Sequence, residues 1–495
     1  MAVLYPLSSN PLTSDKESRC PMPKTIFGTT EKSNFILNMK YDTVRKWISG
    51  LLCACIIVPL VGAMFITGVE SANSFLGSFL YATGFSCILF YIVLLLRKDI
   101  KIKDYPVAFV IFALAVLAAA SYYKVVMSTA PQEFVNTAIL GELGRYEGLL
   151  ALLAYFGIFL LATAVMKRSS VTVLFDIFIG AGIVQAVTAV MQHIPWDFPS
   201  DFRKLPALLV LKDVHLSSGL SDSPIFYGSF LTLASGIAIA GAIYEKNIVR
   251  ARIYGASAAL FFLTGLFTSS VIPLIGIGSA LAVLTVSEIL NKNGGTAFPE
   301  GILRTPRKRL LVLIIVYAVI CGLVFAIQGI YLRDKAIAYS DAFNRLFIVG
   351  SPSPVNKSSL WEIGGERSMR LITNNPILGV GPDLMAKVQL YNSELIVDSI
   401  DKSYNEYLYV AATRGIPSLI VYLALLVMTM RSLFKGMKEF FANREMWFRP
   451  ALLAAVLAYS IQAYFSVSAV TVAPFFWLFM GMSWSKFLGD QAKKS

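Results

Sequence analysis

The sequence predicts an all-α, polytopic integral membrane protein with about twelve transmembrane helices and one long polar segment outside the membrane. Hydrophobic residues make up 56% of its 495 positions and charged residues only 15%, whereas soluble domains average about 25% charged. Apolar runs of roughly 20 residues, each long enough to cross a bilayer as a helix, recur along the whole chain. Basic residues collect in the stretches between alternate runs.

The apolar runs place the predicted helices in order along the chain. We expect spans at residues 47–69, 73–96, 105–123, 148–166, 171–191, 224–244, 252–269, 270–290, 310–330, 416–434, 450–468 and 471–488. The seventh and eighth spans meet in a tight turn at Thr268-Ser269-Ser270. The polar segment 331–415 lies between the ninth and tenth, so the membrane domain consists of residues 47–330 and 416–488.

The charge distribution predicts which loops lie inside the cell. If the N-terminus is inside, the inner stretches hold 29 Lys/Arg and 12 Asp/Glu, a net charge of +17. The remainder of the chain holds 14 Lys/Arg and 18 Asp/Glu, a net charge of −4, and the two add to the total of +13. The inner stretches are 1–46, 97–104, 167–170, 245–252, 288–309, 431–449 and 486–495. Each is net positive, as the positive-inside rule requires. The excess of basic residues is therefore explained by membrane orientation. It is spread over several short loops and does not form the single basic face that binding of nucleic acid requires.

Both chain ends are therefore expected in the cytoplasm, and segment 331–415 on the extracellular or periplasmic side of a plasma or inner membrane. Residues 1–46 are polar, show no signal-peptide pattern and are expected to form a largely disordered tail, with a short second tail at 489–495. One cysteine lies in the first tail and four lie in spans, which leaves no extracellular disulfide framework: Cys20, Cys53, Cys55, Cys87 and Cys321.

Two shorter outer stretches carry candidate site residues. Arg145 and Glu147 directly precede a span, which is typical both of an interfacial anchor and of a guanidinium that binds a lipid phosphate. Stretch 192–223 contains both histidines of the chain, His193 and His215. Irregular chain separates these two and no further ligand has the spacing of a metal motif, so we expect no metal site.

The long segment carries nine acidic and nine basic residues. Arg367 and Arg370 lie three residues apart, on one face if Ser358–Ile372 is helical. Gly379 and Gly381 mark a turn whose backbone can approach a ligand closely.

A capping-box pattern follows in the same segment. Ser403 and Glu406 have the required spacing, which predicts a helix that Gly415 ends. Capping alone explains Glu406, and a catalytic role is the alternative.

Several motifs together resemble the O-antigen ligase and polymerase superfamily, polytopic membrane glycosyltransferases of the GT-C type. The motifs are Gly144-Arg145-Tyr146-Glu147-Gly148, Ser221–Gly228, Arg367 followed by Asn375–Asp383, Asp401–Leu408, Thr413–Pro417 and Ser466–Phe479. They extend over most of residues 45–488. The spacing of Arg203 and Gly219 also resembles a pattern of the polymerases.

The resemblance implies transfer of a glycan from a polyprenyl diphosphate to an acceptor glycan or lipid-anchored acceptor on the outer face, with no metal or other cofactor. Arginines of the outer loops hold the diphosphate in such proteins, which here implies Arg145, Arg203, Arg367 and Arg370. The glycan would contact Gly379, Gly381 and Asn405. Fixed guanidiniums stabilise charge on a leaving diphosphate, and the acceptor hydroxyl needs a general base.

The chain departs from the family at Tyr404, where members commonly have histidine. Tyrosine, with a pKa near 10, is a poor base at neutral pH. We therefore expect another base, or an altered or lost activity. The remaining candidates for the catalytic group are Glu406, Asp401, Glu147 and His215. Ser269-Ser270-Val271 also replaces the Ser-Arg that is usual near the eighth span.

Two other functions stay open. A transporter of lipid-linked oligosaccharide would carry polar groups at the membrane midplane, whereas the spans here hold one clear charge, Asp176, which we expect to snorkel or to pair with a neighbouring loop. An inactive relative would instead act as a scaffold for other polysaccharide-assembly proteins, and the replacement at Tyr404 motivates this alternative.

Overall fold

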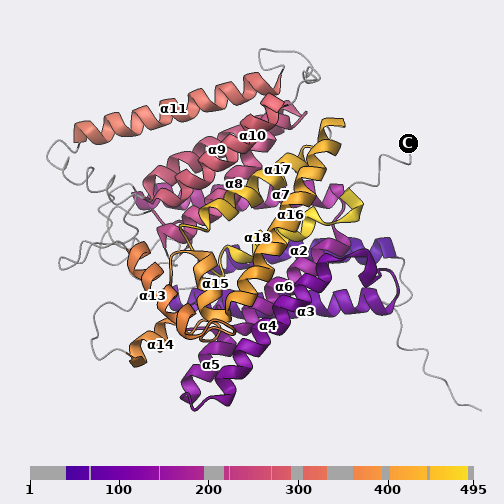
Figure 1. The fold of residues 1–495 in the computed structure, drawn as a ribbon. Coiled ribbons are helices and arrows are strands. Elements are labelled where there is room, and N and C mark those ends of the chain that lie inside the picture. Colours follow the sequence, from indigo (N-terminus) through magenta and orange to yellow (C-terminus); the bar gives the residue numbers. More distant parts are fainter. Residues whose placement is uncertain are drawn as a thin grey trace, which may run out of the picture. The chain divides into compact units, whose positions relative to one another are not determined.

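The computed structural model describes most of the chain between Tyr41 and Leu488. The described residues are 41–65, 69–143, 145–193, 217–221, 223–268, 270–290, 305–331, 360–392, 402–442 and 446–488. They form helices and connecting turns, with no strand among them, which confirms the all-α class (Figure 1). The predicted tails lie outside the described residues, except that the first helix already begins at Tyr41 rather than after residue 46.

A helix is present at each of the twelve predicted spans. These helices are α2 (Tyr41–Phe65), α3 (Val69–Leu96), α4 (Val107–Met127), α6 (Leu149–Val165), α7 (Arg168–His193), α8 (Pro224–Tyr244), α9 (Ile248–Phe267), α10 (Val271–Leu290), α11 (Pro306–Tyr331), α16 (Ile416–Ala442), α17 (Phe448–Gln462) and α18 (Ala473–Ser483). Among the described helices, six contain a stretch long and apolar enough to cross a membrane: α3, α4, α7, α8, α10 and α16. This is consistent with a polytopic membrane protein, while twelve crossings stay a prediction.

The polar stretches add shorter helices to this set. They are η1 (Ile102–Asp104), α5 (Gln132–Leu140), α13 (Leu360–Asn374), α14 (Met385–Asn392), α15 (Glu406–Arg414) and η4 (Lys486–Leu488). The helices expected around Ser358–Ile372 and after Ser403 are confirmed as α13 and α15. The sequence did not predict α5 and α14, because nine and eight residues are too few to display a helical period.

The predicted capping box is wrong. The N-cap of α15 is Asn405, whose side-chain oxygen accepts hydrogen bonds from the backbone N–H groups of Tyr407 at 3.0 Å and Leu408 at 3.1 Å. Asparagine caps helices at least as well as serine, and the Ser403 hydroxyl donates instead to the carbonyl of Asn405. Glu406 is the first helical residue, so capping does not explain its carboxylate.

The helices approach closely where small residues face one another. A Cβ atom at Gly84 in α3 would lie 2.2 Å from the Cα of Ala154 in α6, and one at Gly236 in α8 would lie 2.6 Å from the Cα of Ala455 in α17. Small residues allow such backbone approach in lipid, where the hydrophobic effect does not drive helices together. Helix α6 also packs against α4 and α18, so it has neighbours from both halves of the chain.

The one charge expected inside a span is paired. Asp176 on α7 accepts hydrogen bonds from Arg250 at 2.7 Å and from Tyr254 at 2.6 Å. Pairing is therefore confirmed, although the partners belong to helix α9 and not to a loop.

We expect Gly84→Val to destabilise the protein, because the new side chain meets the backbone of Ala154. Overpacking of this kind costs about 1–3 kcal/mol, and thermal unfolding in detergent measures it as a lower melting temperature. Gly180→Val in α7 is the control, since Gly180 is exposed and no atom lies within 4 Å of the place that a Cβ would take. Equal melting temperatures for the two variants would contradict the close approach of α3 and α6.

Candidate functional site

Four polar segments that are far apart in the sequence meet near the start of α6. They are the turn before α6 (145–147), the turn before α14 (379–384), the start of α15 (402–406) and the connection between α17 and α18 (463–472). The backbone N–H of Gly381 donates to the carbonyl of Thr413 at 2.9 Å, and that of Glu406 donates to the carbonyls of Ala463 and Ser466. The first bond closes the polar segment 331–415 on itself, and the other two hold it against the connection between α17 and α18.

The segments bring six charged side chains together, which we name the charged cluster. Its members are Arg145, Glu147, Asp383, Lys402, Glu406 and Arg414. All but Arg145 are buried, and the side chain of Arg145 is only 15% exposed. Three positive and three negative charges make the cluster neutral as a whole, as burial of so many charges requires.

A buried ion pair between Glu147 and Lys402 lies at the centre of the charged cluster. The ammonium nitrogen of Lys402 is 2.5 Å from Oε2 of Glu147, and both side chains are below one-tenth exposed. Lys402 also donates to the carbonyl of Ser468 at 3.2 Å and lies 4.9 Å from the ring centre of Phe226. Glu147 is thus buried in a pair with a residue from the other half of the chain.

One carboxylate oxygen of Glu147 makes no hydrogen bond to the described residues. Its Oε1 is buried and has no hydrogen-bond partner among the described residues. Burial raises the pKa of Glu147, and the nearby positive charge of Lys402 opposes this shift. A carboxylate with a raised pKa and an unbonded oxygen is suited to accept a proton.

Asp383 lies beside Arg145 and has two closer hydrogen-bond donors. Its Oδ2 accepts from the backbone N–H of Glu142 at 2.7 Å, and its Oδ1 accepts from the hydroxyl of Tyr409 at 2.8 Å. The guanidinium of Arg145 lies 3.5 Å from Oδ1. Asp383 is therefore satisfied mainly by neutral donors and holds Arg145 at a longer distance.

Arg414 at the end of α15 is, like Lys402, a cation of the cluster that the sequence analysis did not assign. It lines a small polar pocket together with Glu147, Asp383 and Ser468. Among the described residues, its guanidinium makes no hydrogen bond or ion pair, and burial lowers its pKa. The sequence did contain a signal, because Arg414 precedes a span in the same way as Arg145.

Strained backbone collects at the same place. Of the four described non-glycine residues with positive φ, Asp383 (53°) belongs to the charged cluster, and Tyr146 (54°) and Tyr404 (50°) lie within two residues of its members in the sequence. This region is costly for tyrosine in particular, and such strain concentrates at functional sites.

Other predicted site residues make contacts that support the fold, and their functional roles stay predictions. The carboxylate of Glu406 accepts from the backbone N–H of Ser468 at 2.6 Å and from its hydroxyl at 3.2 Å. The side-chain oxygen of Asn405 is occupied by capping, which speaks against a glycan contact through that atom. Tyr404, which lies between Lys402 and Asn405 in the sequence, is half-buried.

The predicted turn glycines serve the approach of the backbone to α15. Gly379 (φ 66°) would place a Cβ atom 2.3 Å from the carbonyl carbon of Thr413, and Gly381 (φ 119°) would place one 2.6 Å from Val125. Both positions are buried against protein, and their contact with a glycan stays a prediction.

The two arginines of α13 do not join the pocket wall. Arg370 is exposed and pairs with Glu366 one turn earlier at 2.6 Å, and Arg367 is half-buried on the same helix. Of the remaining candidates, Asp401, Arg203 and His215 lie outside the described residues.

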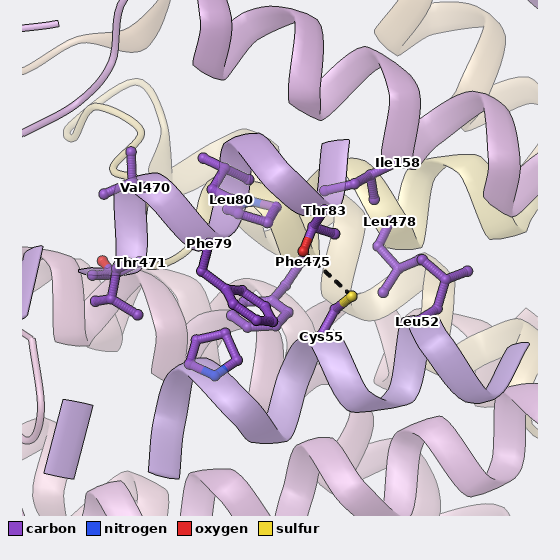
Figure 2. Close-up of a pocket in the computed structure, with 13 residues that line it drawn as sticks. Leu52, Cys55, Phe79, Leu80, Thr83, Ile158, Val470, Thr471, Phe475 and Leu478 are labelled. Carbon is purple, nitrogen blue, oxygen red and sulfur yellow. Dashed lines mark hydrogen bonds between the residues drawn. The ribbon is translucent and has the colours of Figure 1, made fainter. Parts of the chain in front are cut away.

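An apolar pocket lies on the far side of the connection between α17 and α18. It has a volume of 70 Å³, and its lining comes from α2, α3, α6, this connection and α18. Figure 2 shows Val470 and Thr471 at one end and Leu52 and Leu478 at the other. Its few polar atoms include those of Cys55 and Thr83, which contact each other at 3.5 Å. Val470, which lines this apolar pocket, is only two residues from Ser468, which lines the polar pocket.

Comparison with known proteins adds no relative. No protein-family model matches this chain, and no curated protein matches it. The resemblance to the O-antigen ligases and polymerases therefore rests on the motifs quoted above.

We expect Lys402→Met to destabilise the protein by about 3–5 kcal/mol at neutral pH, because it leaves a buried carboxylate without its cation. Burial already raises the pKa of Glu147, and loss of Lys402 raises it further. The folded-state pKa of Glu147 lies above the unfolded value of about 4.3, so protonation of this carboxyl favours folding. This contribution to stability is complete below the unfolded pKa and is lost as the pH rises through the folded-state pKa. The defect should therefore grow from about pH 5 to pH 8, measured as melting temperature.

The double variant Glu147→Gln/Lys402→Met is the matched control. It removes both charges, so its melting temperature should recover part of the loss and should lose the added pH dependence. A defect of Lys402→Met that is the same at every pH would contradict burial of an ionised Glu147.

Proposed function

We propose that the protein transfers a glycan from a polyprenyl diphosphate to an acceptor sugar, as a polymerase or ligase of cell-surface polysaccharide. The observation that carries this proposal is the wall of the polar pocket, which joins Arg414 to Glu147. Arg414 has no described hydrogen-bond partner, and Glu147 has an unbonded oxygen. The reaction needs one group of each kind, a fixed cation and a base.

In the proposed reaction the acceptor hydroxyl oxygen bonds to the anomeric carbon of the donor. The bond between that carbon and the diphosphate oxygen breaks, and the configuration inverts. Glu147 takes the hydroxyl proton, and Arg414 and Arg145 stabilise the negative charge on the departing lipid diphosphate. Arg145 can turn towards a phosphate because the donors from Glu142 and Tyr409 keep Asp383 satisfied.

Lys402 prepares Glu147 for this role. Its ion pair orients the carboxylate and favours the ionised form, against the burial that raises the pKa. The polar pocket has a volume of 20 Å³, room for about one water molecule, so it must widen to admit a donor. The apolar pocket beyond Val470 supplies adjacent surface for an isoprenoid chain.

We expect Arg414→Ala and Glu147→Gln each to lower the rate of glycan transfer by about a hundredfold or more, as loss of an oxyanion donor or a general base does. Purified protein is incubated with lipid-linked repeats, and product length is measured on gels. Arg370→Ala is the control, because it removes the same charge from an exposed pair on α13. Folded Arg414→Ala with wild-type activity would contradict the assignment.

The same preparation separates the alternatives. Movement of labelled lipid-linked glycan into proteoliposomes without bond formation would favour a transporter. Absence of both transfer and movement by the wild-type protein would favour a scaffold.

A further inference from the structure

A second hollow lies away from the charged cluster, in the crevice between α16 and α17. It has a volume of 970 Å³. Its apolar lining consists of Leu426, Val427, Met430, Phe434, Leu457 and Ile461. Several of these side chains are open to the surroundings, with Val427 68% and Phe434 53% exposed. Since α16 is one of the helices apolar enough to cross a membrane, this crevice faces lipid.

Three cations line one end of the crevice. Arg431, Lys435 and Lys438 are spaced four and three residues apart, which places them on one face of α16, and all three are exposed. Among the described residues none of them makes a hydrogen bond or an ion pair. The nearby carboxylate of Glu439 is already bonded to Arg449 at 2.7 Å.

The position of these cations along α16 corresponds to a head-group layer. Helix α16 begins at Ile416, directly after Gly415 and the charged cluster. At about 1.5 Å per residue, Arg431 and Lys438 lie about 22 Å and 33 Å further along the axis. Because the hydrocarbon core is about 30 Å thick, the cations reach the opposite membrane surface. The charge distribution predicts that this surface is cytoplasmic.

We propose that the crevice between α16 and α17 binds an anionic glycerophospholipid of that leaflet. The acyl chains lie against the apolar lining, and the phosphate and its anionic head group lie between Arg431, Lys435 and Lys438. Charge complementarity selects this occupant, because three cations in one basic pocket between membrane helices attract an anionic head group more strongly than a zwitterionic one.

The other end of the crevice connects the lipid to the candidate site. Tyr407 lines it, directly follows Glu406, and donates a hydrogen bond to the carbonyl of Ser460 at 2.6 Å. A bound lipid therefore packs under the contact between α15 and α17. It stabilises the assembled protein whether or not the proposed glycan transfer takes place.

The test compares the full-length protein in nanodiscs of phosphatidylcholine with and without phosphatidylglycerol. Native mass spectrometry measures retained phosphatidylglycerol, and thermal unfolding measures the gain in melting temperature that it gives. The variant Arg431→Gln/Lys435→Gln/Lys438→Gln should lose that gain. Each cation near an anionic surface contributes about fivefold in affinity, so the three together should lower affinity about a hundredfold.

The control is Lys101→Gln/Lys103→Gln/Lys308→Gln, which removes three exposed cations from stretches also predicted to be cytoplasmic. It should bind phosphatidylglycerol like the wild type. An equal loss in both triple variants, or full binding by the crevice variant, would overturn the proposal. If the crevice variant does not purify as a folded protein, the single variant Lys435→Gln is tested instead. Its affinity for phosphatidylglycerol should fall about fivefold, and an unchanged affinity would overturn the proposal.

Discussion

The ion pair between Glu147 and Lys402 is the interaction on which the arrangement of the site depends. Removing two charges from water costs several kcal/mol for each ion, and attraction offsets this only in good geometry with further bonds. Here Ser468 and Phe226 complete the surroundings of Lys402. The start of α6, the start of α15 and the connection between α17 and α18 must therefore keep their relative positions. Displacement of any one leaves a buried charge without compensation.

Backbone strain and side-chain charge depend on each other in this site. Tyr146, Asp383 and Tyr404 hold positive φ values next to the paired charges, at a cost of about 1–3 kcal/mol each. The bonds of Asp383 to Glu142 and Tyr409 return part of that cost. Close helix contacts such as the one at Gly84 and Ala154 provide the rigid frame that prevents relaxation. The site is thus set by the backbone as much as by rotamers.

The helices could be predicted from sequence because apolar runs and turn residues are local signals. The partners in the site could not, because Glu147 and Lys402 are 255 residues apart and no local pattern relates them. The choice between Ser403 and Asn405 as N-cap depended on small differences in propensity. The spacing of Arg367 and Arg370 predicted a shared helical face but not its surroundings. Arg414 precedes a span as Arg145 does, but the sequence did not show that its side chain is buried in the cluster.

The late position of Ser468 has a consequence for biosynthesis. Glu147 leaves the ribosome 321 residues before Ser468, an interval of about 15 to 65 s at ordinary elongation rates. During that time the carboxylate lacks the groups that later surround Lys402, so it must stay hydrated or protonated while the first helices insert. A nascent chain that ends just before Ser468 already contains all six side chains of the charged cluster, but it lacks the carbonyl that accepts from Lys402. A chain that stops short of the final hairpin therefore leaves Lys402 without its carbonyl acceptor and Glu406 without its backbone donor, both of which belong to Ser468.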